Sequence, residues 1–252
     1  MVTEGPVDSV ALAVNNGGDL NCGNLYVYLE QAVAEGKVDE KTIDESVVRL
    51  FTTRFKLGMF DPEDKVPYNR IDHTQVDSPA MQELNLRVAE KILVLLKNKD
   101  NILPLDANAL KTIAVVGPNA DNRKALVGNY EGTASRYFTV LDGLHDYLGD
   151  KVEIRYSQGC HLYADKIHSL SQEGELISEV KGMCAESDVV ICCLGLDAGL
   201  EGEEGDQGNQ FASGDKPSLA LPGHQEEVLR ACLDSGKPVI VVVLSGSALA
   251  LN

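Results

Sequence analysis

The sequence predicts an α/β fold in which a mostly parallel sheet forms the larger, C-terminal part and helices form the N-terminal part. From about residue 112 onwards, short apolar segments alternate with helical segments, as in repeated strand–helix–strand units. The last two apolar segments, at residues 188–196 and 238–245, are apolar on both faces. Parallel strands have this composition when helices cover both sides of their sheet.

Length and composition are those of a soluble globular chain with one large domain or two small ones. Of the 252 residues, 44% are apolar and 24% are charged, which is enough for a core of normal size. The 22 basic and 39 acidic residues give a net charge of −17, which would repel nucleic acid but leaves a neutral substrate unaffected. The longest apolar runs are too short to cross a bilayer, and no signal-peptide pattern follows Met1. We therefore expect a cytoplasmic protein without a membrane partner.

The six cysteines favour buried free thiols over a disulfide framework or a zinc site. None forms a CxxC pair, and Cys192 and Cys193 are adjacent in an apolar strand, where they would point to opposite faces. No pair of cysteine or histidine residues has the spacing of zinc ligands. We therefore expect a reducing compartment, no metal and no cofactor.

Two helices are predicted between residues 24 and 58. The first has apolar residues at helical spacing and ends at Gly36, where glycine suits a C-terminal stop. The second is expected at about residues 42–57, with Thr42 and Glu45 as a capping box and Gly58 after the last turn. The apolar positions of the two helices are Leu25, Leu29, Ala32, Val33, Val47, Val48, Leu50, Phe51 and Phe55.

The periodicity breaks between residues 61 and 78, where proline, aspartate and asparagine predict a connection between two domains. A helix is expected next, at about residues 79–94. Strands are then predicted at residues 112–117, 152–156, 188–196 and 238–245, with helices near 169–186 and 224–235.

The densest chemical signal is the acidic loop after the third predicted strand, at residues 195–206. Ligand sites in open parallel sheets gather beyond the carboxyl ends of the strands, and this loop lies there. Crowded carboxylates raise one another's proton affinity, which suits a general acid. The alternative is a solvated acidic loop on an already acidic protein, and cation binding lacks an EF-hand pattern. The four carboxylates are Glu201, Glu203, Glu204 and Asp206.

A nucleotide site is disfavoured. The turn at residues 116–119 follows a predicted strand, but Pro118 occupies it and no further glycine follows in the GxGxxG register. No Walker A, nucleophile-elbow or HExxH motif is present. The five histidines are scattered, and we assign none of them a catalytic role.

A series of motifs, taken in order, resembles glycoside hydrolase family 3, the exo-acting β-glucosidases and β-xylosidases. The motifs cover essentially the whole chain, and their shared order makes the resemblance specific. They are GDLNCG at residues 18–23, RL at 49–50, RFKLGMFD at 54–61, AEK at 89–91, VLLKN at 94–98, LPL at 103–105, IAVVGPNA at 113–120, GNY at 128–130 and LALPGHQ at 219–225.

The resemblance implies a division of the chain into two domains. In the family, a TIM-like barrel carries an aspartate nucleophile, and an α/β/α sandwich lends a glutamate acid/base from one of its loops. Residues 1–61 are therefore expected to be the C-terminal remnant of the (β/α)8 barrel, and residues 89–252 the sandwich. Residues 62–88 would form the linker and the helix that leads into the second domain.

The resemblance also implies a role for the acidic loop. Residues 200–203 look most like the xylosidase type of loop, and Glu201 best matches the acid/base. Glu203 and Glu204 stay open as alternatives, because the loop varies in length. The implied reaction is hydrolysis of terminal β-linked xylose or glucose from oligosaccharides or aryl glycosides by a retaining mechanism.

The chain departs from the family pattern at the nucleophile. The family's Ser-Asp motif lies upstream of the GDLNCG stretch, and Asp8 and Asp19 do not match its context. We expect Asp8 to cap the helix before Asp19 instead. No nucleophile is therefore expected in this chain, which looks like a fragment or truncated gene product and is expected to be inactive alone.

Two kinds of partner follow from that departure. Helices from the end of a barrel would keep exposed apolar faces, which favour docking to the missing barrel segment or association into a homo-oligomer. The rival hypothesis is a non-catalytic carbohydrate-contacting or interaction module, or an inert remnant.

Overall fold

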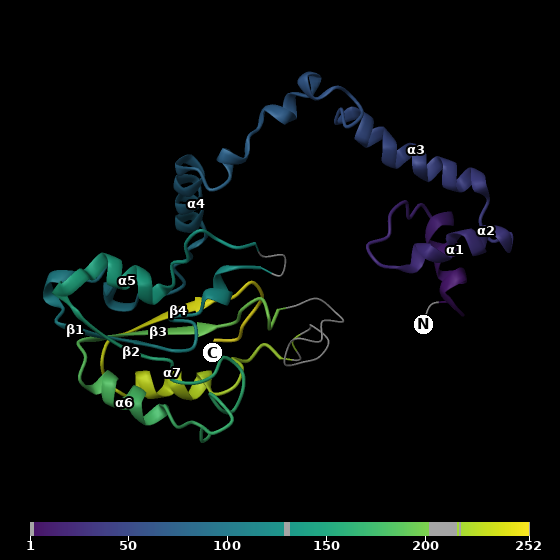
Figure 1. Ribbon diagram of the computed structural model, residues 1–252. Coiled ribbons are helices and arrows are strands. Elements are labelled where there is room, and N and C mark those ends of the chain that lie inside the picture. The colour runs from purple at the N-terminus through teal and green to yellow at the C-terminus, as the bar shows by residue number, and fades with distance from the viewer. Residues whose placement is uncertain (1–2, 129–131, 202–215, 217, 252) are drawn as a thin grey trace. The chain divides into compact units, whose positions relative to one another are not determined.

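The computed structural model describes residues 3–128, 132–201, 216 and 218–251 (Figure 1). The chain divides into two compact units, Met1–Val94 and Leu95–Asn252. The division of residues 1–88 into barrel remnant and linker stays a prediction. No described helix is both long enough and apolar enough to span a membrane.

Helices form the N-terminal unit, as the sequence predicts. A small core joins the first of them, through the buried side chains of Val10, Val14, Ala32 and Val38. Short 3-10 turns connect the helices at Leu25–Tyr28, Glu63–Lys65, Pro67–Arg70 and His73–Gln75. The α-helices are α1 (Pro6–Asn15), α2 (Leu29–Ala34), α3 (Glu40–Lys56) and α4 (Pro79–Ile92).

Two predicted helix caps are wrong. Helix α3 starts earlier than expected, because the Asp39 side chain accepts the N–H of Lys41 and takes the N-cap position from Thr42. Asp8 lies inside the first turn of α1 rather than at its cap. Proline at the first helical position is already set for helical geometry and has no N–H to satisfy, so α1 begins at Pro6 without a side-chain cap.

The C-terminal unit is a four-stranded parallel sheet in the order β2-β1-β3-β4. Each predicted strand is present, and no boundary differs by more than one residue from the predicted one. Helix α5 covers one face of the sheet, and α6 and α7 cover the other (Figure 1). The strands are β1 (Thr112–Val116), β2 (Glu153–Ser157), β3 (Val189–Gly195) and β4 (Val239–Leu244), and the helices are α5 (Val140–Leu148), α6 (Ile177–Ala185) and α7 (Gln225–Leu233). The predicted α/β/α sandwich is confirmed.

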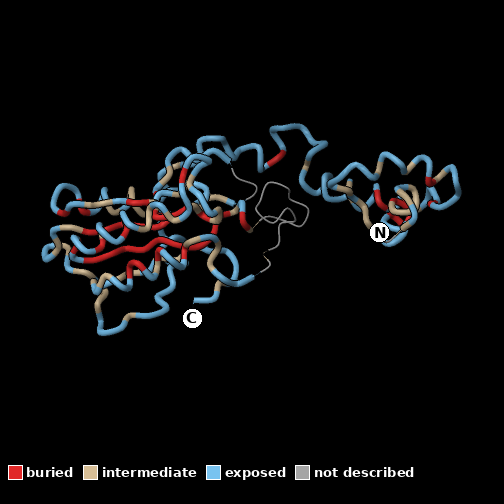
Figure 2. Tube along the Cα trace, turned by 90° about the horizontal axis from the view of Figure 1, so that it is seen from below, coloured by how far each residue is buried: buried red, intermediate tan, exposed pale blue. Residues whose placement is uncertain are grey.

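The core of the sandwich follows the two central strands, where buried residues gather (Figure 2). Every residue of β3 is buried. Cys192 packs with the α6 and α7 side, whereas Cys193 packs with the α5 side, so the predicted alternation of these thiols is confirmed.

Helix α5 was not predicted from the sequence, and α6 begins later than expected. Polar residues and Gly143 interrupt the apolar spacing of α5. A capping box starts the helix: the Thr139 hydroxyl accepts the Asp142 N–H, and the Asp142 carboxylate accepts the Thr139 N–H. Threonine followed by an acid three residues later was the signal that could have located this helix.

We predict that Gly117→Ala destabilises the sandwich severely. Gly117 has a φ of 108°, and an added Cβ would lie 2.1 Å from the Cys193 carbonyl oxygen. Relieving that overlap requires the two strands to move apart, at a cost of about 3 kcal/mol or more. Thermal unfolding followed by circular dichroism measures the loss. The matched control is Gly143→Ala, where nothing lies within 4 Å and the helix should gain up to about 1 kcal/mol. Equal stability of the two variants would contradict the prediction.

We also predict that one of the six thiols reacts quickly in the folded protein. Cys22 is exposed and the other five are buried. Burial is the main cause that raises the pKa of Cys160 and of Cys193 to about 12, so few thiolates form there near pH 8. Ellman's reagent should titrate one thiol before unfolding and none quickly in Cys22→Ser. Two or more fast thiols would show that the helix layer opens readily.

Candidate active site

The strand order places a change of winding direction between β1 and β3. The chain passes from β1 to β2 on one side, and β3 pairs with β1 on the other. A crevice forms at such a point beyond the carboxyl ends of the strands, because the loops leave in opposite directions. The loop after β1, residues 117–122, and the loop after β3, residues 196–201, meet there.

Side-chain hydrogen bonds connect these two loops. The buried Asn119 amide donates to the carbonyl of Leu196 at 3.1 Å. The Asn122 amide donates to Asn119 Oδ1 at 3.0 Å and to Asp197 Oδ2 at 3.4 Å. Residues far apart in sequence are therefore held in one polar network at the edge of the sheet.

Asp197 organises the turn that follows β3. Its Oδ1 accepts the N–H of Gly199 at 3.0 Å and that of Leu200 at 3.3 Å. Its backbone carbonyl accepts the N–H of Leu200 at 3.0 Å and that of Glu201 at 3.2 Å. Leu200 is 1% exposed and packs with Leu162 and Leu196, which fixes the turn to the core.

Glu201 sits at the end of this turn, half-buried. Its Oε2 accepts the N–H of Gly246, in the loop after β4, at 3.0 Å. Its Oε1 is buried and has no hydrogen-bond partner among the described residues. Glu203, Glu204 and Asp206 lie outside the described residues, so the predicted crowding of the four carboxylates stays a prediction.

Gln225 pairs with the backbone polar groups at the end of β3, beyond the residues that pair with β1. It is fully buried, and its Oε1 accepts the Gly195 N–H at 2.8 Å. Its Nε2 donates to the carbonyls of Gly195 at 2.8 Å and of Leu162 at 2.7 Å. The sequence motif at residues 219–225 contained this residue, but nothing in its spacing indicated a structural role for the amide.

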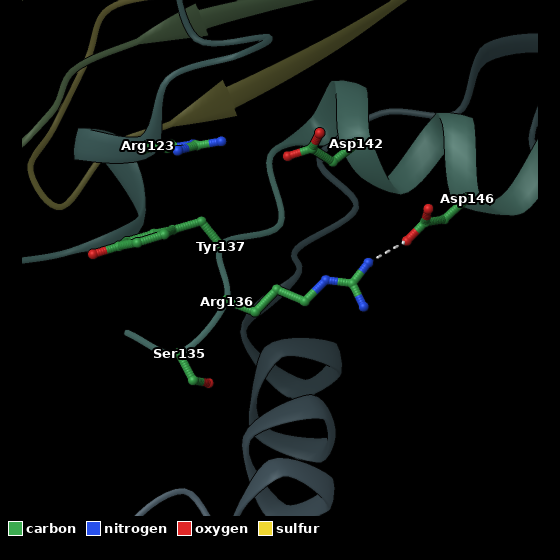
Figure 3. A pocket seen from close by; sticks show the side chains of 6 residues that line it. All are labelled: Arg123, Ser135, Arg136, Tyr137, Asp142 and Asp146. Atoms are coloured by element: carbon green, nitrogen blue, oxygen red, sulfur yellow. Dashed lines mark hydrogen bonds and ion pairs between the residues drawn. The ribbon is translucent and has the colours of Figure 1, made fainter. Parts of the chain in front are cut away.

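A pocket of about 350 Å³ lies beside the N-terminal end of α5 (Figure 3). The Arg136 guanidinium pairs with Asp146 at 3.2 Å and lies 4.0 Å from the Phe138 ring centroid. Hydrogen bonds from Thr139, and then the charges of Arg123 and Arg136, lower the pKa of Asp142. The pocket therefore offers donors, acceptors and a ring with little net charge. It is lined by Arg123, Ser135, Arg136, Tyr137, Asp142 and Asp146.

The described residues include no group of three histidine, cysteine or acidic side chains that could hold a metal ion. Asp8 and Asp19, in the N-terminal unit, are each paired with a cation. Asp8 lies 2.8 Å from Lys37 Nζ. Asp19 accepts from Arg49 Nε at 2.8 Å and Nη2 at 2.7 Å, and hydrogen bonds from Arg49 and Ser46 lower its pKa.

We predict that Gln225→Met destabilises the sandwich by about 3 kcal/mol or more, since each buried polar group left unpaired costs about 1–3 kcal/mol. The variant keeps a side chain of similar volume. It leaves the N–H and carbonyl of Gly195 and the carbonyl of Leu162 without their hydrogen-bond partner. Urea unfolding measures the change. Gln172→Met, at an exposed glutamine, is the control and should cost little. A small loss at Gln225 would mean that water replaces its bonds.

Comparison with known proteins identifies the family. Residues 93–252 match the profile of the "Glycosyl hydrolase family 3 C-terminal domain". "Probable beta-D-xylosidase 7" of Arabidopsis thaliana is 34% identical over 250 residues, which are 98% of this chain and 30% of that protein. The "Beta-xylosidase" of Formosa agariphila is 36% identical over 234 residues, covering 89% of this chain and 29% of that one.

Solved structures agree with this assignment. A GH3 exo-beta-xylosidase, solved with a xylobiose aziridine probe, superposes with a TM-score of 0.78 at 27% identity, over 95% of this chain and 28% of that one. A b-glucosidase from Erythrobacter marinus gives 0.77 at 27% identity, over 96% of this chain and 34% of that one. The chain thus spans about 30% of the length of its curated relatives. It belongs to glycosyl hydrolase family 3 and carries that family's C-terminal domain at residues 93–252.

Proposed function

We propose that this chain supplies the acid/base half of a retaining exo-β-glycosidase, with Glu201 as the general acid/base. The observation that carries the proposal is the position of Glu201: its carboxylate is held by the Gly246 N–H at the ligand-binding edge of the sheet. The curated relatives cited above carry β-xylosidase names, which favours terminal β-linked xylose as the substrate, with glucose as the alternative.

A retaining glycosidase needs two carboxyl groups about 5–5.5 Å apart. In the first step, Glu201 would give its proton to the glycosidic oxygen, and the nucleophile would bond to the anomeric carbon. The bond from that carbon to the glycosidic oxygen would break, and the leaving group would depart as an alcohol. In the second step, the Glu201 carboxylate would take a proton from water, the water oxygen would bond to the anomeric carbon, and the bond to the nucleophile would break and release the sugar.

The hydrogen bond to Gly246 distinguishes the two oxygens of Glu201. Because the N–H donates to Oε2, that oxygen must present a lone pair. In the neutral acid, the carbonyl oxygen is the stronger acceptor, so this bond favours the proton on Oε1, which is buried and has no partner among the described residues. We propose that Oε1 carries the proton that the leaving group receives.

In this proposal the nucleophile comes from a barrel segment outside residues 1–252. Asp8 and Asp19 are both engaged in ion pairs and do not match the family's nucleophile motif. We propose that the N-terminal unit is the C-terminal part of that barrel. Its exposed rings support this, because Phe60 stacks on Phe51 and lies tilted against Phe55 while each of the three stays at least 39% exposed. In isolation, such a surface would favour self-association.

A non-catalytic role in sugar binding is the second candidate. The pocket near α5 favours it, since its mixture of donors, acceptors and an aromatic ring suits a neutral, hydroxyl-rich ligand (Figure 3). Under this hypothesis, Glu201→Gln leaves sugar binding unchanged.

We predict that the chain alone does not hydrolyse aryl β-xylosides and that adding the barrel segment of a family 3 β-xylosidase restores turnover. In the restored enzyme, Glu201→Gln should lower kcat for 2,4-dinitrophenyl β-xyloside by about 10²–10⁴, because water loses its general base. Azide, which needs no base, should rescue the variant and give xylosyl azide of retained configuration.

Glu203→Gln and Glu204→Gln are the matched controls, and each removes one carboxylate from the same loop. They should retain most of the activity. Loss and azide rescue in one of them instead would transfer the acid/base role to that residue. Turnover by the chain without the barrel segment would overturn the division of the site between two segments.

A further inference from the structure

We propose that Asp197 is a positioning residue for Glu201 and that Asn122 locks it to the loop after β1. The catalytic meaning of this inference rests on the proposed function of Glu201. The structural part does not, because it concerns how the sandwich fixes the Glu201 carboxylate.

Asp197 has an unusual setting for an acid. It is 9% exposed and is the second residue after the fully buried strand β3. A buried carboxyl group needs hydrogen-bond partners, and two backbone N–H groups and the Asn122 amide supply them. Both of its oxygens are thereby directed to fixed partners, one in its own turn and one in the loop after β1.

Asp197 also fixes the position of the Glu201 backbone. The Asp197 side chain holds the N–H groups of Gly199 and Leu200, and its carbonyl holds that of Glu201. The turn cannot rotate without losing these bonds and lifting Leu200 out of the core. The Glu201 backbone is therefore fixed relative to the end of β3.

The Glu201 carboxylate is fixed at a second point, by Gly246 in the loop after β4. A shift of the turn would move the Glu201 carboxylate relative to the Gly246 N–H and so change this hydrogen bond. Asn122 and Asp197 would thus act on Glu201 through the turn and through the bond to Gly246.

A purely structural role for Asp197 makes a different prediction. Loss of the turn bonds would then lower stability alone. A positioning role also loosens the hydrogen bond from the Gly246 N–H to Glu201 Oε2, so the Glu201 carboxyl signal and the Gly246 amide signal should both respond to the variants.

The test is a carboxyl titration of the full 252-residue chain, labelled with ¹³C at the glutamate side-chain carboxyls. The signal missing from Glu201→Gln assigns Glu201. Asn122→Ala removes no charge, and the looser turn should raise the Glu201 midpoint by about half a pH unit or more. Asp197→Ala should abolish the pH-dependent shift of the Gly246 amide signal, and Asp197→Asn, which keeps one acceptor oxygen for the turn, should restore part of it.

Asp121→Asn is the matched control. It removes one exposed carboxylate next to Asn122 and should leave the midpoint within about 0.2 unit, because exposed charges are screened. An unmoved Glu201 midpoint in folded Asn122→Ala would overturn the inference. If Asp197→Ala does not fold, Asn122→Ala still carries the test, since it leaves the Asp197 bonds to Gly199 and Leu200 in place.

Activity separates this inference from the proposed function. With the barrel segment added, the alkaline limb of kcat/KM should move upward in Asn122→Ala together with the carboxyl midpoint. A moved midpoint in an assembly without activity would support the positioning role and overturn the catalytic proposal.

Discussion

Strand β3 is buried along its whole length, so every polar group at its carboxyl end needs a partner inside the protein. Strand β1 pairs with it only as far as Cys192, and the residues beyond lose that neighbour. Beyond that point, side chains supply the hydrogen bonds: Gln225 binds both polar groups of Gly195, and Asn119 binds the carbonyl of Leu196. The need to pair these polar groups therefore gathers polar side chains at the point where the chain leaves the sheet. Glu201 lies in the loop that begins at this point.

The two units differ in how many apolar side chains they bury, and therefore in how far their own packing stabilises them. The sandwich buries apolar side chains on both faces of its sheet. The N-terminal unit has one small buried cluster, and α4 buries none of its residues. A helix gains most of its stability from packing an apolar face, so α3 and α4 lack much of the packing that would stabilise them. This imbalance fits a segment that completes its packing against another part of a larger protein.

The strands were predictable because parallel, fully covered strands have an unmistakable composition, as the segment of β3 shows. The ends of the helices were less predictable from the sequence. Asp39 and Thr42 are both good caps, and which of them is used depends on the chain entering α3. The candidate site divides in the same way. The acidic loop indicated Glu201 as a candidate, which stays a prediction, whereas nothing in the sequence indicated Asn122, Asp197 or Gln225, because their partners are set by which strands lie side by side.

The acid/base geometry inferred for Glu201 depends on three neighbouring strands of one sheet. The loop after β1 anchors Asp197, the loop after β3 carries Glu201, and the loop after β4 supplies the N–H that orders its carboxylate. Strand pairing fixes the spacing of these loops, so the orientation of the carboxylate is set within the sandwich. A reaction that needs two carboxyl groups at one fixed separation then requires only that a nucleophile be brought to a pre-arranged acid. Under the proposed function, the sandwich would hold the acid in place while the barrel segment supplies the nucleophile.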